Sequence, residues 1–119
     1  MKNASVTIYH KPNCSTSKDV LQMIRARGIE PEVVQYLKTP PSRDTLRQLA
    51  AGAGTTVRGL LRQKGTPYDE LGLGEDKWSD EQLLDFLQEH PILLQRPIVV
   101  AAKGTRICRP KESVYEILP

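Results

Sequence analysis

The sequence predicts an α/β fold in which a mixed sheet is flanked by helices. A β-prone run, a helical pattern and a second β-prone run follow one another within the first 36 residues. A mainly helical stretch occupies the middle of the chain, and two more β-prone runs precede a last helical segment. Strand–helix–strand order favours a parallel pair with a right-handed crossover, whereas a short turn between strands favours an antiparallel pair.

The first part of the chain is a βαβ motif. Residues 6–9 form a short β-prone run, which ends at the polar residues 10–13. Val20, Leu21 and Ile24 then lie on one face of a helix, and Gly28 is a natural C-terminal stop for it. Residues 32–36 follow as the second strand.

Three helical segments are expected in the middle of the chain. Each combines a capping residue with apolar side chains three and four apart: Ser42 with Leu46, Leu49 and Ala50; Thr55 or Thr56 with Val57, Leu60 and Leu61; and Ser79 with Leu83, Leu84 and Leu87. Gln82, three residues after Ser79, completes a capping box, and Pro91 ends that helix. Residues 69–77 are polar and are expected to form a loop.

The last part of the chain predicts a hairpin and a helix. Residues 98–101 and 105–108 are two strands separated by three residues. A final helix begins at Arg109-Pro110 and turns Val114, Ile117 and Leu118 inward. The complete order, βαβ, a helical insertion at about 42–90 and then ββα, is the thioredoxin-like plan. We expect a single domain over residues 1–119.

Composition limits the function classes. Hydrophobic residues make up 39% of the chain and charged residues 26%, as in ordinary globular proteins, and no apolar run is long enough to span a membrane. The first five residues lead directly into a strand pattern without a signal peptide, and two distant cysteines make no secreted disulfide framework. We therefore expect a cytoplasmic protein that does not bind membranes.

The net charge of +3 fits either a solvated surface or the attraction of an anion. Aromatic residues are few and scattered, and no nucleic-acid-binding motif is present, so we expect no nucleic acid partner.

Cys14 lies between the first strand and the first helix and is the candidate nucleophile. A cysteine is often only a small core residue, but polar neighbours surround this one. The free N–H groups and the positive dipole end of a helix favour the thiolate, which is the reactive form. Hydroxyl groups at 15–17 and possible positive charge on Lys18 and His10 add to this effect.

Two common cysteine motifs are absent. Dithiol redox proteins need a second cysteine three residues after the first, where this chain has Ser17. Low-molecular-weight phosphatases need an arginine six residues after the cysteine, where this chain has Val20. The pattern indicates an active site with a single thiol.

Three arginines at the ends of predicted elements are candidates for binding an oxyanion. Arg62 follows the second helical segment, Arg96 precedes Pro97 and the third strand, and Arg109 follows the fourth strand. Guanidinium groups bind tetrahedral oxyanions through paired N–H bonds and relieve the repulsion between a thiolate and an anion. In a thioredoxin-like plan, the residue before the third strand lies beside the cysteine, and Pro97 is the candidate for a cis proline there. Taken singly, a surface arginine is more often a solvated charge, and the indication lies in the placement of all three at the ends of elements.

Other conspicuous residues have plainer interpretations. Cys108 fits core packing, with a resolving partner for Cys14 as the alternative. His90 fits a structural or exposed position, and Trp78 fits packing. No His, Cys and Asp cluster has the spacing of a metal site, and no glycine-rich phosphate loop is present.

Several segments together resemble the glutaredoxin-coupled arsenate reductase family. The resemblance covers nearly the whole chain and is carried by residues 8–17, 36–41, 57–62, 96–100 and 104–110. It implies a thioredoxin-like oxidoreductase of arsenic detoxification that reduces arsenate to arsenite through a covalent Cys14–arsenic intermediate. It also implies glutathione as co-substrate, glutaredoxin as a second reductant and no bound cofactor.

The resemblance also implies residue roles. Cys14 would be the nucleophile, His10 would lower its pKa, and Ser17 would donate to the thiolate. The anion and its arsenic-bound intermediate would be held by Arg62, Arg96 and Arg109. Ser15 stands where typical members have glycine. Two alternatives remain open: another glutathione-dependent thiol reductase, and a non-catalytic regulatory binding module.

Overall fold

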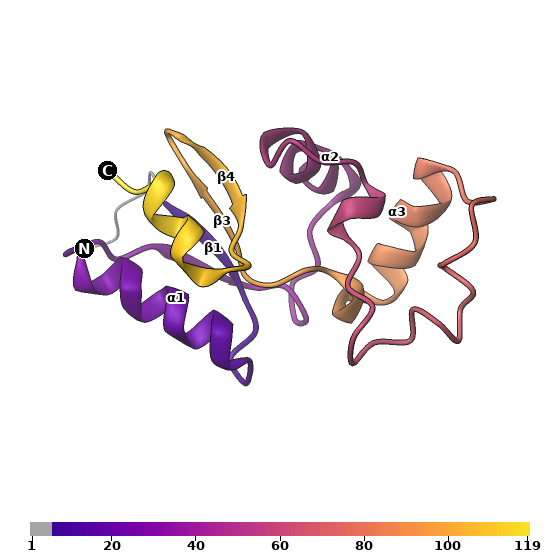
Figure 1. Cartoon of the computed structure of the whole chain (residues 1–119), viewed down its shortest axis with the longest axis horizontal. Helices are drawn as coiled ribbons and strands as arrows, with labels where there is room; N and C mark the ends of the chain where they lie inside the picture. The colour runs from indigo at the N-terminus through magenta and orange to yellow at the C-terminus, as the bar shows by residue number, and fades with distance from the viewer. Residues whose placement is uncertain (1–5) are drawn as a thin grey trace. The chain divides into compact units, whose positions relative to one another are not determined.

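The computed structural model describes residues 6–119 (Figure 1). The predicted absence of a signal peptide concerns residues 1–5, which lie outside the described residues. The strands are β1 (Thr7–His10), β2 (Glu32–Gln35), β3 (Ile98–Ala101) and β4 (Gly104–Ile107). The α-helices are α1 (Ser15–Ala26), α2 (Arg43–Gly52) and α3 (Asp80–Glu89). Three short 3-10 helices complete the fold: η1 (Arg58–Leu60), η2 (Pro91–Leu93) and η3 (Lys111–Glu116).

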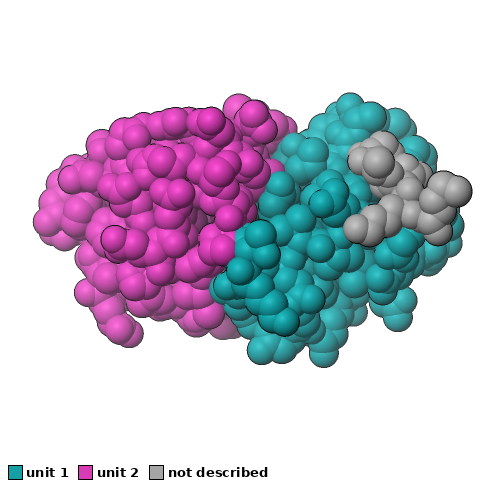
Figure 2. All heavy atoms as spheres, turned by 180° about the vertical axis from the view of Figure 1, so that it is seen from behind, with its two compact units in different colours: residues 1–39, 96–119 teal, residues 40–95 magenta. Residues whose placement is uncertain are grey.

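The chain divides into two compact units, coloured separately in Figure 2. Residues up to 39 and from 96 onward form the sheet unit, and residues 40–95 form the helical unit. The predicted helical insertion at about 42–90 falls within the second of these. That the whole chain is a single domain stays a prediction.

The sheet unit contains a mixed sheet with the strand order β2-β1-β3-β4. β1 and β2 are parallel, with Thr7 opposite Glu32 and His10 opposite Gln35. β3 runs antiparallel to both β1 and β4. The predicted thioredoxin-like fold, with a parallel βαβ pair followed by a hairpin, is confirmed.

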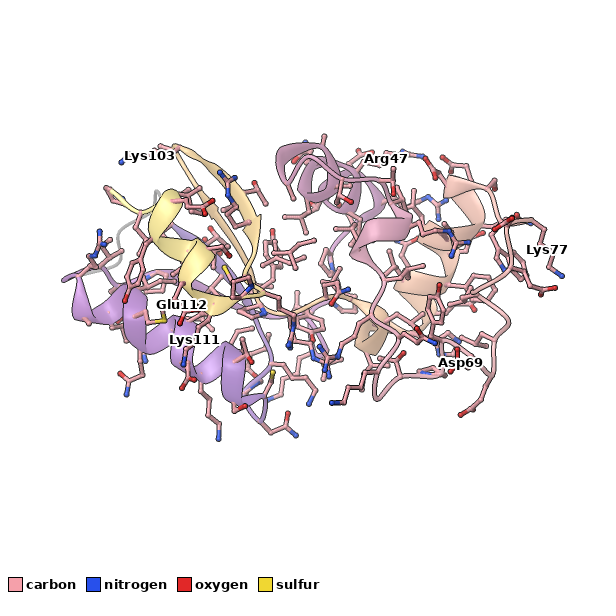
Figure 3. All side chains as sticks on the ribbon, viewed as in Figure 1. Arg47, Asp69, Lys77, Lys103, Lys111 and Glu112 are labelled. Atoms are coloured by element: carbon pink, nitrogen blue, oxygen red, sulfur yellow. The ribbon has the colours of Figure 1, made fainter. Side chains whose placement is uncertain are left out.

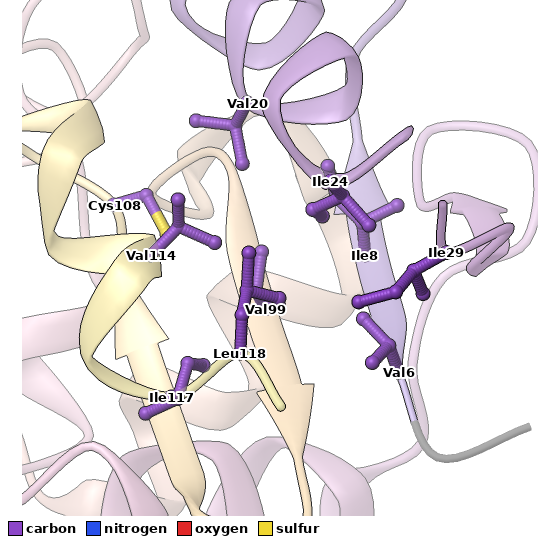
Figure 4. Close-up of a cluster of buried hydrophobic side chains, with 10 residues drawn as sticks. All are labelled: Val6, Ile8, Val20, Ile24, Ile29, Val99, Cys108, Val114, Ile117 and Leu118. Atoms are coloured by element: carbon purple, nitrogen blue, oxygen red, sulfur yellow. The ribbon is translucent and has the colours of Figure 1, made fainter. Parts of the chain in front are cut away.

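One hydrophobic cluster holds α1 and η3 against one face of the sheet (Figure 4). Its fully or almost fully buried members come from β1, α1 and β3, from residues that flank β1 and α1, and from the C-terminal segment: Val6, Ile8, Val20, Ile24, Ile29, Val99, Cys108, Val114, Ile117 and Leu118. Alternate residues of a strand point to the same face, so His10 lies on the face that Val6 and Ile8 turn toward α1. This alternation brings the His10 ring to the start of the helix.

Two boundaries and one helix type in the sheet unit differ from the prediction. β2 ends at Gln35 because the N–H groups of Lys38 and Thr39 turn back to the Gln35 carbonyl, both at 2.9 Å. The hairpin turn has two residues, since Ala101 pairs directly with Gly104. The last helix is a 3-10 helix, although Val114, Ile117 and Leu118 are buried as predicted.

The helical unit confirms two of the three predicted helices. Ser42 caps α2 by accepting a hydrogen bond from the Thr45 N–H, and Ser79 and Gln82 form the predicted capping box of α3. The predicted helix after Thr55 or Thr56 is wrong, because only η1 forms there. The chain becomes extended at Leu61, which pairs with Leu94 in an isolated bridge. This backbone pairing overrides the helical spacing of the side chains.

Within residues 6–119, no helix is both long enough and apolar enough to cross a membrane.

The capping box predicts a measurable stability effect. Ser79→Ala removes the acceptor for the Gln82 N–H at the start of α3 and should lower the free energy of unfolding by about 1 kcal/mol. Denaturant unfolding measures this difference. Ser15→Ala is the matched control, since Ser15 is an exposed residue of a first helical turn but not a cap. An equal effect of both substitutions would contradict the role given to Ser79.

Candidate active site

Cys14 is the N-cap residue of α1 and stands where the chain turns from β1 into the helix. The Cys14 N–H donates to the Lys11 carbonyl at 3.0 Å, and the Lys18 N–H donates to the Cys14 carbonyl at 2.9 Å. The first bond closes the turn after β1, and the second begins the helix. The side chain is partly exposed, so its sulfur is open to solutes at the positive end of the helix dipole.

The surroundings of Cys14 favour the thiolate. Partial burial by itself raises the pKa of the thiol, but three groups outweigh it. The Ser17 backbone N–H and the Arg96 guanidinium donate to the sulfur, and the charges of Arg109 and Arg96 attract it, so the pKa of Cys14 lies below its usual value. A lowered pKa raises the fraction of the thiol that is present as the nucleophilic thiolate at a given pH.

Arg96 and Arg109 meet at the start of β3 and the end of β4. Arg109 Nε donates to the Arg96 carbonyl at 2.9 Å, and its Nη2 lies 3.8 Å from Cys14 Sγ. Arg96 is buried and Arg109 is exposed. The peptide bond before Pro97 is cis, as predicted. Two of the three predicted arginines are therefore placed with the thiol.

His10 and Ser17 form a buried pair beside the turn. His10 Nδ1 and Ser17 Oγ are 2.6 Å apart, and Ser17 Oγ also accepts the Lys11 N–H at 3.1 Å. Burial, helped by the charge of Arg25, lowers the pKa of His10 and so disfavours its charged form. This direction disfavours the positive charge that the sequence suggested as possible for His10, and the part of His10 in lowering the pKa of Cys14 stays a prediction. His10 bonds Ser17 in the first turn of α1, the helix that Cys14 caps. The groups that lower the pKa of the Cys14 thiol are the Ser17 N–H, Arg96 and Arg109.

Ser17 donates to the Cys14 sulfur through its backbone, whereas the sequence pointed to its hydroxyl group. The donor to the sulfur is the Ser17 backbone N–H, while its hydroxyl bonds His10 and Lys11. Sequence reasoning identified the residue but not the group, because the choice depends on the helical turn that Cys14 begins. The bond between Arg109 and the Arg96 carbonyl was also missed, since no local pattern in the sequence links these two residues.

Arg62, the third predicted arginine, belongs to the helical unit. Its Nε donates to the Lys64 carbonyl at 3.0 Å, and its backbone N–H donates to the Leu93 carbonyl at 2.7 Å. Its part in binding an anion stays a prediction.

Cys108 is a core residue. It is fully buried in the hydrophobic cluster of Figure 4, and burial raises the pKa of its thiol to about 12. A protonated and enclosed thiol does not act as a resolving partner, so the packing interpretation is confirmed. Cys14 is the accessible thiol among the described residues.

The remaining predictions concern packing and metals. Trp78 packs against Phe86 in an edge-to-face arrangement with ring centroids 5.0 Å apart, and its Nε1 donates to the Gly72 carbonyl at 2.8 Å, which confirms a packing role. His90 is the C-cap residue of α3. Residues 6–119 contain no group of three or more His, Cys, Asp or Glu side chains placed to hold a metal ion.

Comparison with known proteins identifies the family of the chain. The ArsC family matches residues 9–117, a range that includes every residue of the site described above. The chain belongs to the ArsC family. It is 58% identical over 116 residues to an arsenate reductase from Escherichia coli, covering 98% of this chain and 82% of that protein. It is 61% identical to an arsenate reductase from Rhizobium meliloti (strain 1021), covering 97% of this chain and 82% of that protein.

A solved structure of similar fold agrees with this assignment. The arsenate reductase from Vibrio cholerae matches this ArsC chain with a TM-score of 0.91 and 44% identity. The match covers 98% of this chain and 100% of the Vibrio cholerae chain.

The two thiols predict a selective alkylation. Iodoacetamide should modify Cys14 of the folded ArsC protein at neutral pH and leave Cys108 unmodified, because alkylation requires an accessible thiolate. Peptide mass spectrometry after limited reaction measures the sites. In denaturant both cysteines should react. Equal labelling of the two thiols in the folded protein would contradict the burial assigned to Cys108.

Proposed function

We propose that this ArsC protein reduces arsenate to arsenite, with Cys14 as the nucleophile and glutathione and glutaredoxin as the sources of electrons. The observation that carries the proposal is the placement of a thiol of lowered pKa beside two guanidinium groups. Relatives named arsenate reductase, 58% and 61% identical to the chain, support arsenate as the substrate.

In the first step, Arg96, Arg109 and Arg62 hold arsenate. The Cys14 sulfur forms a bond to arsenic, and one arsenate oxygen takes up protons and leaves as water. Arsenic stays in the +5 state, so this step needs no reductant. The arginines reduce the repulsion between a thiolate and an oxyanion and stabilise the charge that spreads over the arsenate oxygens during attack.

The later steps take two electrons from outside the chain. Arsenic passes from +5 to +3 while one glutathione thiol and one glutaredoxin thiol join as a mixed disulfide. One arsenic-bound oxygen leaves as water in this reduction. A water molecule then attacks the Cys14–As(III) adduct, the sulfur–arsenic bond breaks, and arsenite leaves while Cys14 returns to the thiolate after loss of a proton. The buried position of Cys108 supports this division, because the chain has no second accessible thiol among its described residues to complete the reduction.

The same chemistry supports a cytoplasmic location. A single catalytic thiol works through repeated cycles only where thiols stay reduced, which is the condition of the cytoplasm. The site needs no bound cofactor, since sulfur and arsenic carry the electrons.

Arsenate turnover with a matched pair of cysteine variants tests the proposal. Purified protein should consume reducing equivalents when arsenate, glutathione and glutaredoxin are all present. This consumption should cease when any one of the three is omitted. Cys14→Ser should abolish turnover, and Cys108→Ala should retain it because that thiol lies in the core. Arg109→Gln should lower kcat/KM for arsenate by about 10²-fold, as expected for removal of one preorganised donor.

Two results would contradict the proposal. Turnover by Cys14→Ser would exclude the covalent intermediate on sulfur. Reduction of glutathione mixed disulfides without reduction of arsenate would favour the alternative of a different glutathione-dependent reductase.

A further inference from the structure

We propose that two loops beside Cys14, residues 11–13 and 37–38, form a docking surface for an acidic thiol protein that delivers the reducing sulfur. We call these residues the docking loops. The inference rests on the proposed function and adds to it the surface by which the protein reductant is recognised.

The sheet places the docking loops together. β1 and β2 are parallel neighbours, and His10 at the end of β1 is opposite Gln35 at the end of β2. Adjacent strands lie about 4.8 Å apart, so the segments that follow His10 and Gln35 leave the same edge of the sheet as neighbours. Each segment turns at once: the Cys14 N–H bonds the Lys11 carbonyl, and the Lys38 N–H bonds the Gln35 carbonyl. These turns keep the docking loops at the edge where Cys14 lies.

The docking loops expose apolar surface. The Leu37 side chain is 42% exposed, and Leu37 and Tyr115 are the two exposed large hydrophobic residues among the described part of the chain. Pro12 and Asn13 are also exposed. An apolar side chain left in solvent beside a reactive group is a typical feature of a recognition surface.

The charge around this apolar surface has one sign. Residues 11–18 and 36–39 contain Lys11, Lys18 and Lys38 and no acidic residue. The next acidic residue along α1 is Asp19, which is paired with Lys111 at 3.0 Å. Figure 3 labels Lys111. With exposed Arg109 near the sulfur, the surface around Cys14 is cationic and complements a partner that is acidic around its own thiol.

A protein fits this surface better than a small thiol. The reductant must bring its sulfur to Cys14 from outside, because Cys108 is enclosed. The positive charges attract small anionic thiols as well, but such a molecule at Cys14 has no need of an apolar contact on the next loop. A protein partner covers Leu37 while it engages the lysines, as interfaces combine an apolar centre with a charged rim.

Kinetics with matched variants test the docking surface. The variants are Lys38→Glu and Leu37→Ala, and neither residue belongs to the site assigned to arsenate. The controls are Lys103→Glu, which makes the same charge change at the hairpin turn labelled in Figure 3, and Tyr115→Ala, which removes the other exposed hydrophobic residue. Lys103 follows β3, which runs antiparallel to β1, so it lies at the opposite edge of the sheet from Cys14.

We expect Lys38→Glu to raise KM for glutaredoxin about tenfold and Leu37→Ala to raise it severalfold. The KM for arsenate and for glutathione should stay within twofold of the wild-type values, as should all three constants in both controls. Added salt should raise KM for glutaredoxin in the wild type and have less effect in Lys38→Glu. An equal KM for glutaredoxin in Lys38→Glu and Lys103→Glu would overturn the inference. A change in KM for glutathione alone would overturn it too, because the surface would then serve a small thiol.

A binding experiment separates this inference from the proposed function. Amide resonances of an isotope-labelled Cys14→Ser chain are followed by NMR during titration with glutaredoxin. Changes in the amide chemical shifts of residues 11, 13, 37 and 38 would support docking even if the wild-type protein failed to reduce arsenate. Normal arsenate turnover with shifts confined to other surfaces would overturn the docking inference and leave the proposed function standing.

Discussion

The stabilisation of one negative charge, the Cys14 thiolate, organises the site. The turn after β1 places the sulfur at the start of α1, where the Ser17 N–H donates to it. Arg109 links the sulfur to the segment that precedes β3, since one of its nitrogens bonds the Arg96 carbonyl and another approaches the sulfur at 3.8 Å. The hydrophobic cluster between β1, α1 and η3 fixes the positions of these elements. Packing thereby holds the sulfur close to the groups that stabilise its charge.

The two cysteines show how burial decides the chemistry of a thiol. Cys108 is enclosed by apolar side chains, and its pKa rises to about 12. Cys14 is partly exposed beside hydrogen-bond donors and cations, and its pKa falls. One chain therefore holds an inert thiol and an activated thiol. This difference explains why the proposed reaction takes its electrons from external thiols and why the surface around Cys14 matters for recognition.

The sequence predicted most of the fold because its signals are local. Capping residues and apolar spacing located α2 and α3, and the position of Cys14 between a strand and a helix predicted its activation. The expected helix after Thr55 or Thr56 failed because pairing between Leu61 and Leu94, more than thirty residues apart, decides the backbone there. The bond from Arg109 to the Arg96 carbonyl depends on a contact between distant residues, and the lowered pKa of His10 depends on burial. Such effects leave no mark on the spacing of residues along the chain.

The pKa of Cys14 tests the account most directly. Ultraviolet absorbance of the thiolate, recorded against pH in a Cys108→Ala background, gives this value in the folded protein. We expect a pKa below the value of about 8.5 for a free cysteine, a clear rise in Arg109→Gln and a smaller rise in His10→Asn, since His10 acts through Ser17. A pKa at or above 8.5, or a pKa unchanged in Arg109→Gln, would contradict the activation of Cys14 by its surroundings.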